Sequence, residues 1–109
     1  MKATLVRYTT HTERAAENEA LIHEVFEELR RVAPVGFRYG AFKQADSATF
    51  VHFAMMDQAD GSNPLVQLDS FKRFQLGLHE RCVELPVVTH LATLVDAYGM
   101  APAAETHVS

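Results

Sequence analysis

A chain of 109 residues, 48% hydrophobic and 22% charged, is long enough for one domain with a sizeable core. Its formal charge of -4 comes with ten scattered Lys and Arg residues, so no basic face is available to a nucleic acid. The single cysteine, Cys82, excludes an internal disulfide and is expected to be a buried, reduced thiol. Hydrophobic runs far below about 18 residues exclude a membrane helix, and an N-terminus without a signal pattern predicts a cytoplasmic protein.

The N-terminal third predicts a strand followed by an amphipathic helix. Residues 3–10 alternate and are rich in β-branched and aromatic side chains, which favours a strand. Thr10 and Glu13 have the spacing of a capping box, which predicts a helix start there. Apolar residues then recur at three- and four-residue steps until Pro34 and Gly36 end the helix.

The middle of the chain predicts a hairpin with one unusually apolar strand. Residues 36–43 form its first strand, and a turn with Asp and Ser occupies residues 44–47. The second strand, residues 48–56, is apolar on both faces and contains His52. A strand of this kind is expected in the interior of a sheet, covered on both sides.

The C-terminal third predicts a second helix and a last strand. A short turn is expected at residues 63–67, and an amphipathic stripe covers residues 65–78. Pro86 is expected to separate this helix from a strand at residues 87–98. The tail at residues 99–109 has little to bury and is expected to be flexible.

The resulting order, β-α-β-β-α-β, is the ferredoxin-like split βαβ arrangement, an α+β fold with an antiparallel sheet ordered 4-1-3-2. Two helices cover only one face of such a sheet. Because the predicted strands are apolar on both faces, a second copy is the economical cover for the other face. The sequence therefore predicts a homodimer of one domain, residues 1–98.

With this layout, residues 3–98 resemble the dimeric α/β-barrel superfamily, in particular its antibiotic biosynthesis monooxygenase-like domains. The stretches that carry the resemblance are TLVRYT, FEELRRVAP, GFRYGAF, TFVHFA and NPLVQLDSFKRFQ. The resemblance implies a homodimer in which two sheets form a barrel, with a pocket in each subunit between sheet and helices. Fold alone does not select one activity within such a superfamily.

The superfamily includes cofactor-free monooxygenases that act on polycyclic aromatics and enzymes that degrade haem. The haem-degrading branch uses an Asn on the first strand and a Trp and a His on the last helix. Here the strand has Arg7 and Tyr8, the chain contains no Trp, and only His79 could replace the helix histidine. The resemblance therefore does not favour haem degradation, and it keeps His79 among the ligand-binding candidates.

His52 is the candidate catalytic residue. A neutral imidazole in an apolar pocket can act as a base or hydrogen-bond the carbonyl or phenol of a ligand. The alternative is a core or interface histidine that is bonded to a neighbouring group. Neither reading is excluded by the sequence.

Arg7, Arg38 and Tyr39 are the candidate ligand-binding residues on strands. Each could point into the pocket and orient an anionic or phenolic group, cross the dimer interface, or form an ion pair or core contact. His23 and Glu27, four residues apart on one helix, provide too few ligands for a metal site. No metal and no cofactor are therefore expected.

Two functions are compatible with these residues. One is a cofactor-independent monooxygenase-like or small-molecule-binding protein whose ligand is aromatic or polyketide-like. Its activity is implied by the resemblance alone. The other is a non-catalytic homodimer whose pocket is simply core.

Overall fold

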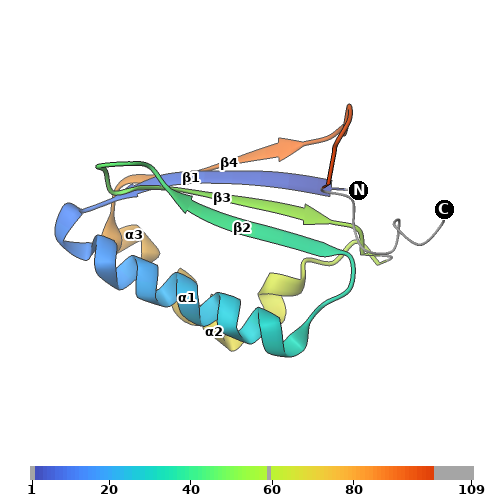
Figure 1. Ribbon diagram of the computed structural model, residues 1–109. Coiled ribbons are helices and arrows are strands. Elements are labelled where there is room, and N and C mark those ends of the chain that lie inside the picture. The colour runs from blue at the N-terminus through green and yellow to red at the C-terminus, as the bar shows by residue number, and fades with distance from the viewer. Residues whose placement is uncertain (1, 59, 100–109) are drawn as a thin grey trace.

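A computed structural model describes residues 2–58 and 60–99 of the chain as one antiparallel sheet with helices on one of its faces (Figure 1). The elements are β1 (Lys2–Thr10), α1 (Ala15–Val32), β2 (Phe37–Lys43), β3 (Thr49–Met56), α2 (Asp69–Gln75), α3 (Leu78–Arg81) and β4 (Cys82–Leu91). The sheet order is β2-β3-β1-β4, so the predicted ferredoxin-like α+β fold is confirmed. Most of the tail predicted to be flexible, residues 100–109, lies outside the described part.

β3 occupies the interior position that its composition predicted, between β1 and β2. On the face toward the helices, Phe50 and His52 are buried. On the opposite face, Met55 is also buried, and it borders a small hollow formed with residues 93–97. The segment after β4 therefore lies against part of the face that the helices leave uncovered.

The start of α1 differs from the capping box that the sequence predicted. Thr10 is still part of β1, and its hydroxyl donates to the carbonyl of His11 at 3.0 Å instead of capping the helix. A 3-10 turn at Thr12–Arg14 follows, and α1 begins at Ala15 without a side-chain cap. The prediction was wrong because strand pairing holds Thr10: its amide donates to the carbonyl of Ala48.

The second helical region is divided into three short pieces. The expected turn is a 3-10 turn at Pro64–Gln67, and the Asn63 side chain accepts a hydrogen bond from the Leu65 amide at its start. Gly77, in the left-handed region at φ 81°, separates α2 from α3. The predicted amphipathic stripe is therefore present but does not form one continuous helix. Within the described residues, no helix is long and apolar enough to cross a membrane.

β4 begins five residues before the predicted start at Val87 and ends at Leu91 instead of residue 98. Pro86 lies inside this strand, where it was expected to precede it. β4 is an edge strand, and its register against β1 shifts between the pairs Arg7–Val87 and Thr9–Glu84. An edge strand with such an irregularity tolerates a residue that lacks an amide hydrogen.

The left-handed conformation of Gly77 gives a stability prediction. Gly77→Ala should lower the free energy of unfolding by about 1 to 2 kcal/mol, because a side chain disfavours this region. Gly40→Ala on β2 is the matched control: an added Cβ would make an ordinary 3.6 Å contact with Phe42, so its effect should be neutral or stabilising by under about 1 kcal/mol. Urea denaturation of both variants measures the difference. Equal effects would contradict the prediction.

Candidate functional site

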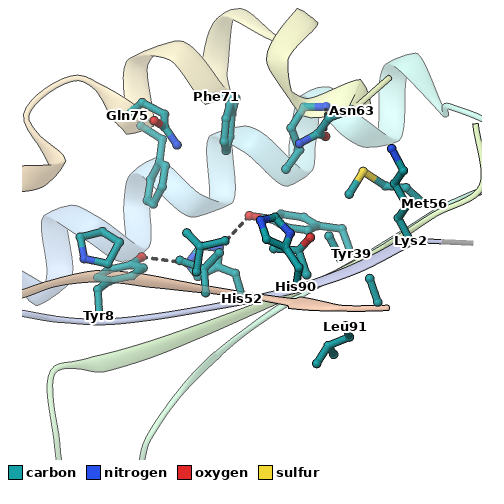
Figure 2. A pocket seen from close by; sticks show the side chains of 18 of the residues that line it. Lys2, Tyr8, Tyr39, His52, Met56, Asn63, Phe71, Gln75, His90 and Leu91 are labelled. Atoms are coloured by element: carbon teal, nitrogen blue, oxygen red, sulfur yellow. Dashed lines mark hydrogen bonds between the residues drawn. The ribbon is translucent and has the colours of Figure 1, made fainter. Parts of the chain in front are cut away.

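A cavity of about 770 Å³ lies between the inner face of the sheet and the second helical region. Tyr8, His52 and Tyr39 line it from the strands, and Phe71 lines it from α2 (Figure 2). Phe74 of α2 also lines it. Pockets that hold small organic ligands usually measure about 300 to 1,000 Å³ and are mostly apolar. The cavity therefore has the size and the lining of a binding site for a small organic ligand.

The polar side chains around this cavity are mainly hydroxyls, amides and imidazoles. Lys2 from β1 contributes a cation, and no Asp or Glu is among the described residues that line the cavity. Besides Tyr8, Tyr39 and the imidazoles of His52, His79 and His90, the other polar side chains are those of Thr4, Asn63 and Gln75. A ligand with an acidic oxygen would therefore meet an amine and no described carboxylate.

Both ring nitrogens of His52 are engaged by tyrosine hydroxyls. The Nε2 atom lies 2.8 Å from the Tyr8 hydroxyl, and the Nδ1 atom lies 2.6 Å from the Tyr39 hydroxyl. Dashed lines in Figure 2 mark these two hydrogen bonds at the floor of the cavity. His52 is thus a fully bonded histidine that nevertheless borders an open space.

The chain of hydrogen bonds continues from Tyr8 into the helical layer. Asn18 of α1 donates from its amide nitrogen to the Tyr8 hydroxyl at 2.8 Å, and its amide oxygen accepts from Arg81 Nε at 3.0 Å. Arg81, only 1% exposed, also donates to the backbone carbonyls of Phe74 and Leu76. Each polar side chain from Arg81 to Tyr8 therefore has a partner.

Aromatic packing fixes the orientation of the central groups. The Tyr8 ring stacks on Phe50 with centroids 5.5 Å apart, and the His52 ring lies 5.5 Å from Phe74 in a tilted arrangement. Tyr39 stacks on Phe26 of α1 at 5.1 Å. Such pairs add about 0.5 to 1.5 kcal/mol beyond area burial, so the rings are restrained before any ligand binds.

Burial keeps these groups uncharged near neutral pH. Desolvation lowers the pKa of His52 to about 4 and raises the pKa of both Tyr8 and Tyr39 above the ordinary phenol value. His52 is therefore a weak base at pH 7, and neither phenol is ionised. The arrangement is suited to hydrogen bonding and orientation, and poorly suited to strong general base catalysis.

Two of the five predicted site residues meet at the cavity floor. Neighbouring strands bring together His52 on β3 and Tyr39 on β2, and exposed His79 on α3 also lines the cavity. Arg7 and Arg38 are exposed and do not line it. Their strand positions alternate with those of Tyr8 and Tyr39, so they face the other side of the sheet, where a role at a dimer interface remains a prediction.

Sequence reasoning did not identify Tyr8, Asn18 and Arg81 as parts of the site. Asn18 stands within the apolar stripe of α1 and is completely buried, and an amide at a core position is a signal of a buried polar partner. That partner, Arg81, lies 63 residues further along the chain. The signal therefore indicates a contact without saying which residue makes it.

Cys82 is a buried free thiol, as predicted, and burial raises its pKa, which disfavours the reactive thiolate. Within residues 2–58 and 60–99, no group of three or more His, Cys, Asp and Glu side chains is placed to hold a metal ion.

Comparison of the structure with solved structures identifies the fold. A crystal structure of an antibiotic biosynthesis monooxygenase matches with a TM-score of 0.71 and 15% identity, covering 86% of this chain and 99% of the other. Rv0793 from Mycobacterium tuberculosis matches with a TM-score of 0.73 and 20% identity, covering 89% of this chain and 98% of the other. A mutant of SnoaB, a cofactor-independent oxygenase from Streptomyces nogalater, matches with a TM-score of 0.59 and 18% identity, covering 88% and 98%.

These similarities confirm the predicted resemblance at the level of the fold: the chain has the architecture of antibiotic biosynthesis monooxygenase domains. No family model and no curated protein sequence matches the chain. Identities of 15 to 20% leave the activity to be argued from the site.

The depressed pKa of His52 predicts that acid destabilises the protein. The folded chain holds a neutral His52 down to about pH 4, whereas the unfolded chain takes up a proton near the ordinary pKa of 6.5. The free energy of unfolding should therefore fall by about 3 kcal/mol as the pH is lowered from 6.5 to 4, and the contribution of His52 to the slope should fade as the pH rises above 6.5.

Urea denaturation over a pH series measures this fall. His52→Gln should remove most of it, and His23→Gln, the same change at an exposed position on α1, should retain it. An NMR titration of the His52 ring with a midpoint near its ordinary value would contradict the prediction.

Proposed function

We propose that the protein binds an aromatic or polyketide-like small molecule in the cavity and acts as a cofactor-independent monooxygenase-like enzyme. The observation that carries this proposal is the cavity of about 770 Å³ whose floor is the Tyr39–His52–Tyr8 group. The architecture shared with a cofactor-independent oxygenase supports the choice of reaction class.

In this reaction the ligand supplies the electrons itself. A carbanion or enolate of the ligand reduces molecular oxygen, one oxygen atom enters the ligand as a carbonyl, and the other leaves as water with two hydrogens from the ligand. The weakly basic His52 suits a ligand that is already acidic. Lys2 and the Tyr39 hydroxyl would stabilise its anion, and the apolar walls would exclude water from it.

A non-catalytic binding module is the second candidate. It is favoured by the saturation of both His52 ring nitrogens, because a histidine bonded on both sides has no free nitrogen for a substrate proton. In this case the cavity holds a ligand but does not alter it.

Anthrone, a tricyclic ketone with an acidic methylene group, is a suitable probe for both candidates. We expect the purified protein to consume oxygen with anthrone and to form anthraquinone and water, measured with an oxygen electrode and by absorbance. Ala54→Leu, which fills the cavity beside His52, should lower the rate at least tenfold. Ala45→Leu, the same change in the exposed β2–β3 turn, should leave the rate unchanged.

The outcomes separate the candidates. Anthrone binding that Ala54→Leu abolishes, without oxygen uptake, would favour the binding module. Neither binding nor oxygen uptake would overturn the proposed ligand class.

We also propose that the protein is a homodimer in which the second copy covers the outer sheet face. This proposal rests on large apolar side chains that are exposed on that face, among them Phe42 at 66% and Val87 at 64%. Their strand positions alternate with those that face the helices, so no helix of the same chain covers them. Apolar exposure at this density is usual for an interface and costly in a monomer.

Light scattering at micromolar concentration should give twice the mass of one chain. Val87→Asp should raise the dissociation constant at least tenfold, because it would bury a carboxylate in the interface. Val35→Asp introduces the same charge at an exposed position outside the strands and should leave the mass unchanged. A monomeric wild-type protein would contradict the proposal.

A further inference from the structure

The hydrogen-bond chain from Arg81 to Tyr39 has one direction, which is set at its buried end. A guanidinium only donates, so the atom of Asn18 that faces Arg81 Nε must be the amide oxygen. The amide nitrogen of Asn18 therefore faces Tyr8 and donates to its hydroxyl oxygen. The orientation of this amide is thus decided by a residue that never loses its charge.

The direction passes from Tyr8 to His52. Because the Tyr8 oxygen accepts from Asn18, its own proton needs another acceptor, and His52 Nε2 lies 2.8 Å away. A neutral imidazole carries one proton, so the bare Nε2 requires the proton on Nδ1. Nδ1 then donates to the Tyr39 oxygen at 2.6 Å.

The reversed arrangement leaves a buried donor without a partner. With the proton on Nε2, the Tyr8 oxygen would accept from both His52 and Asn18, and the Tyr8 proton would have no other acceptor among the described residues. Tyr8 is 1% exposed, so water does not compensate, and such a group costs about 1 to 3 kcal/mol. In the first arrangement the unused proton belongs to Tyr39, which is only partly buried and lines the cavity.

We infer that Tyr39 presents a hydrogen-bond donor to the cavity, with its polarity fixed by Arg81 and Asn18, and that it recognises an acceptor oxygen of the ligand such as a ketone carbonyl or an enolate. The inference rests on the proposed ligand-binding function and specifies the ligand atom that the site selects. Among the described residues, His52 is the one hydrogen-bond partner of the Tyr39 hydroxyl, so the donor is available. Arg81 and Asn18 are positioning residues in this scheme, because they act through Tyr8 and His52.

The substitution Asn18→Asp should reverse the direction of the hydrogen bonds from Tyr8 to Tyr39, and it hardly changes the shape of the side chain. One carboxylate oxygen would still accept from Arg81, and the other would accept the proton of Tyr8. The Tyr8 oxygen would then accept from Nε2, and Nδ1 would accept the proton of Tyr39. The hydroxyl of Tyr39 would offer the cavity only lone pairs. Gln67→Glu makes the same chemical change at an exposed position that does not line the cavity, and it serves as the control.

The first measurement needs neither a variant nor a ligand. Two-bond proton–nitrogen NMR correlations of the His52 ring should show the Nδ1-protonated tautomer in the wild-type protein and in Gln67→Glu, and the Nε2-protonated tautomer in Asn18→Asp. An Nε2-protonated ring in the wild-type protein overturns the inferred polarity, whether or not a ligand binds.

The second measurement tests the ligand atom with two planar probes that differ in one carbonyl, fluorenone and fluorene. By equilibrium dialysis, fluorenone should bind the wild-type protein and Gln67→Glu about tenfold more tightly than fluorene, because one hydrogen bond is usually worth about that factor. Tyr39→Phe and Asn18→Asp should abolish this preference. Equal binding of the two probes by the wild-type protein overturns the assignment to Tyr39. Absence of binding by both overturns the proposed function, while the ring tautomer still decides the polarity.

Discussion

The buried guanidinium of Arg81 is the interaction on which the site depends. Burying a charge costs several kcal/mol unless its donors are satisfied. Here the carbonyls of Phe74 and Leu76 accept two of its donors, Asn18 accepts a third, and the Phe74 ring lies 5.3 Å below the charge. These partners come from α2, the turn before Gly77 and α1. The Arg81 side chain therefore connects α1 to α2 and also orients the Asn18 amide at the start of the hydrogen-bond chain.

The sequence predicted the sheet because its signals are local and periodic. Alternation along residues 48–56 and the three- and four-residue steps of α1 depend only on which face is buried. The residues at which helices and strands begin and end were less predictable. Thr10 is a residue type that often caps a helix, and Pro86 is one that often interrupts a strand or helix. Both nevertheless lie within strands, because strand pairing overrides these local preferences. Such boundaries are decided by contacts between distant residues, which no local pattern contains.

The same distinction explains what could be predicted of the site. His52 and Tyr39 stand out in the sequence because each is a polar group in an apolar strand, and adjacent strands bring them together. Tyr8 had no local signal, since an aromatic residue on a strand is most often core. Asn18 and Arg81 acquire their role from each other across 63 residues. The members of a buried polar network can be suspected one by one, but its connections and its direction exist only in the fold.

The structural and the functional explanation of His52 are compatible once the direction of the hydrogen bonds from Arg81 to Tyr39 is considered. A histidine with both nitrogens bonded is a structural residue by the usual criterion. Yet the hydrogen bond at Nδ1 ends on the Tyr39 hydroxyl, which lines the cavity, so the His52 ring connects the orientation of Asn18 and Arg81 to a group that a ligand can contact. His52 in this position keeps the Tyr39 proton directed to the cavity, so the hydrogen bonds need not rearrange when a ligand binds. The acidity needed for any oxygen chemistry must then come from the ligand, because the protein supplies a fixed donor and a mostly apolar cavity in place of a strong base.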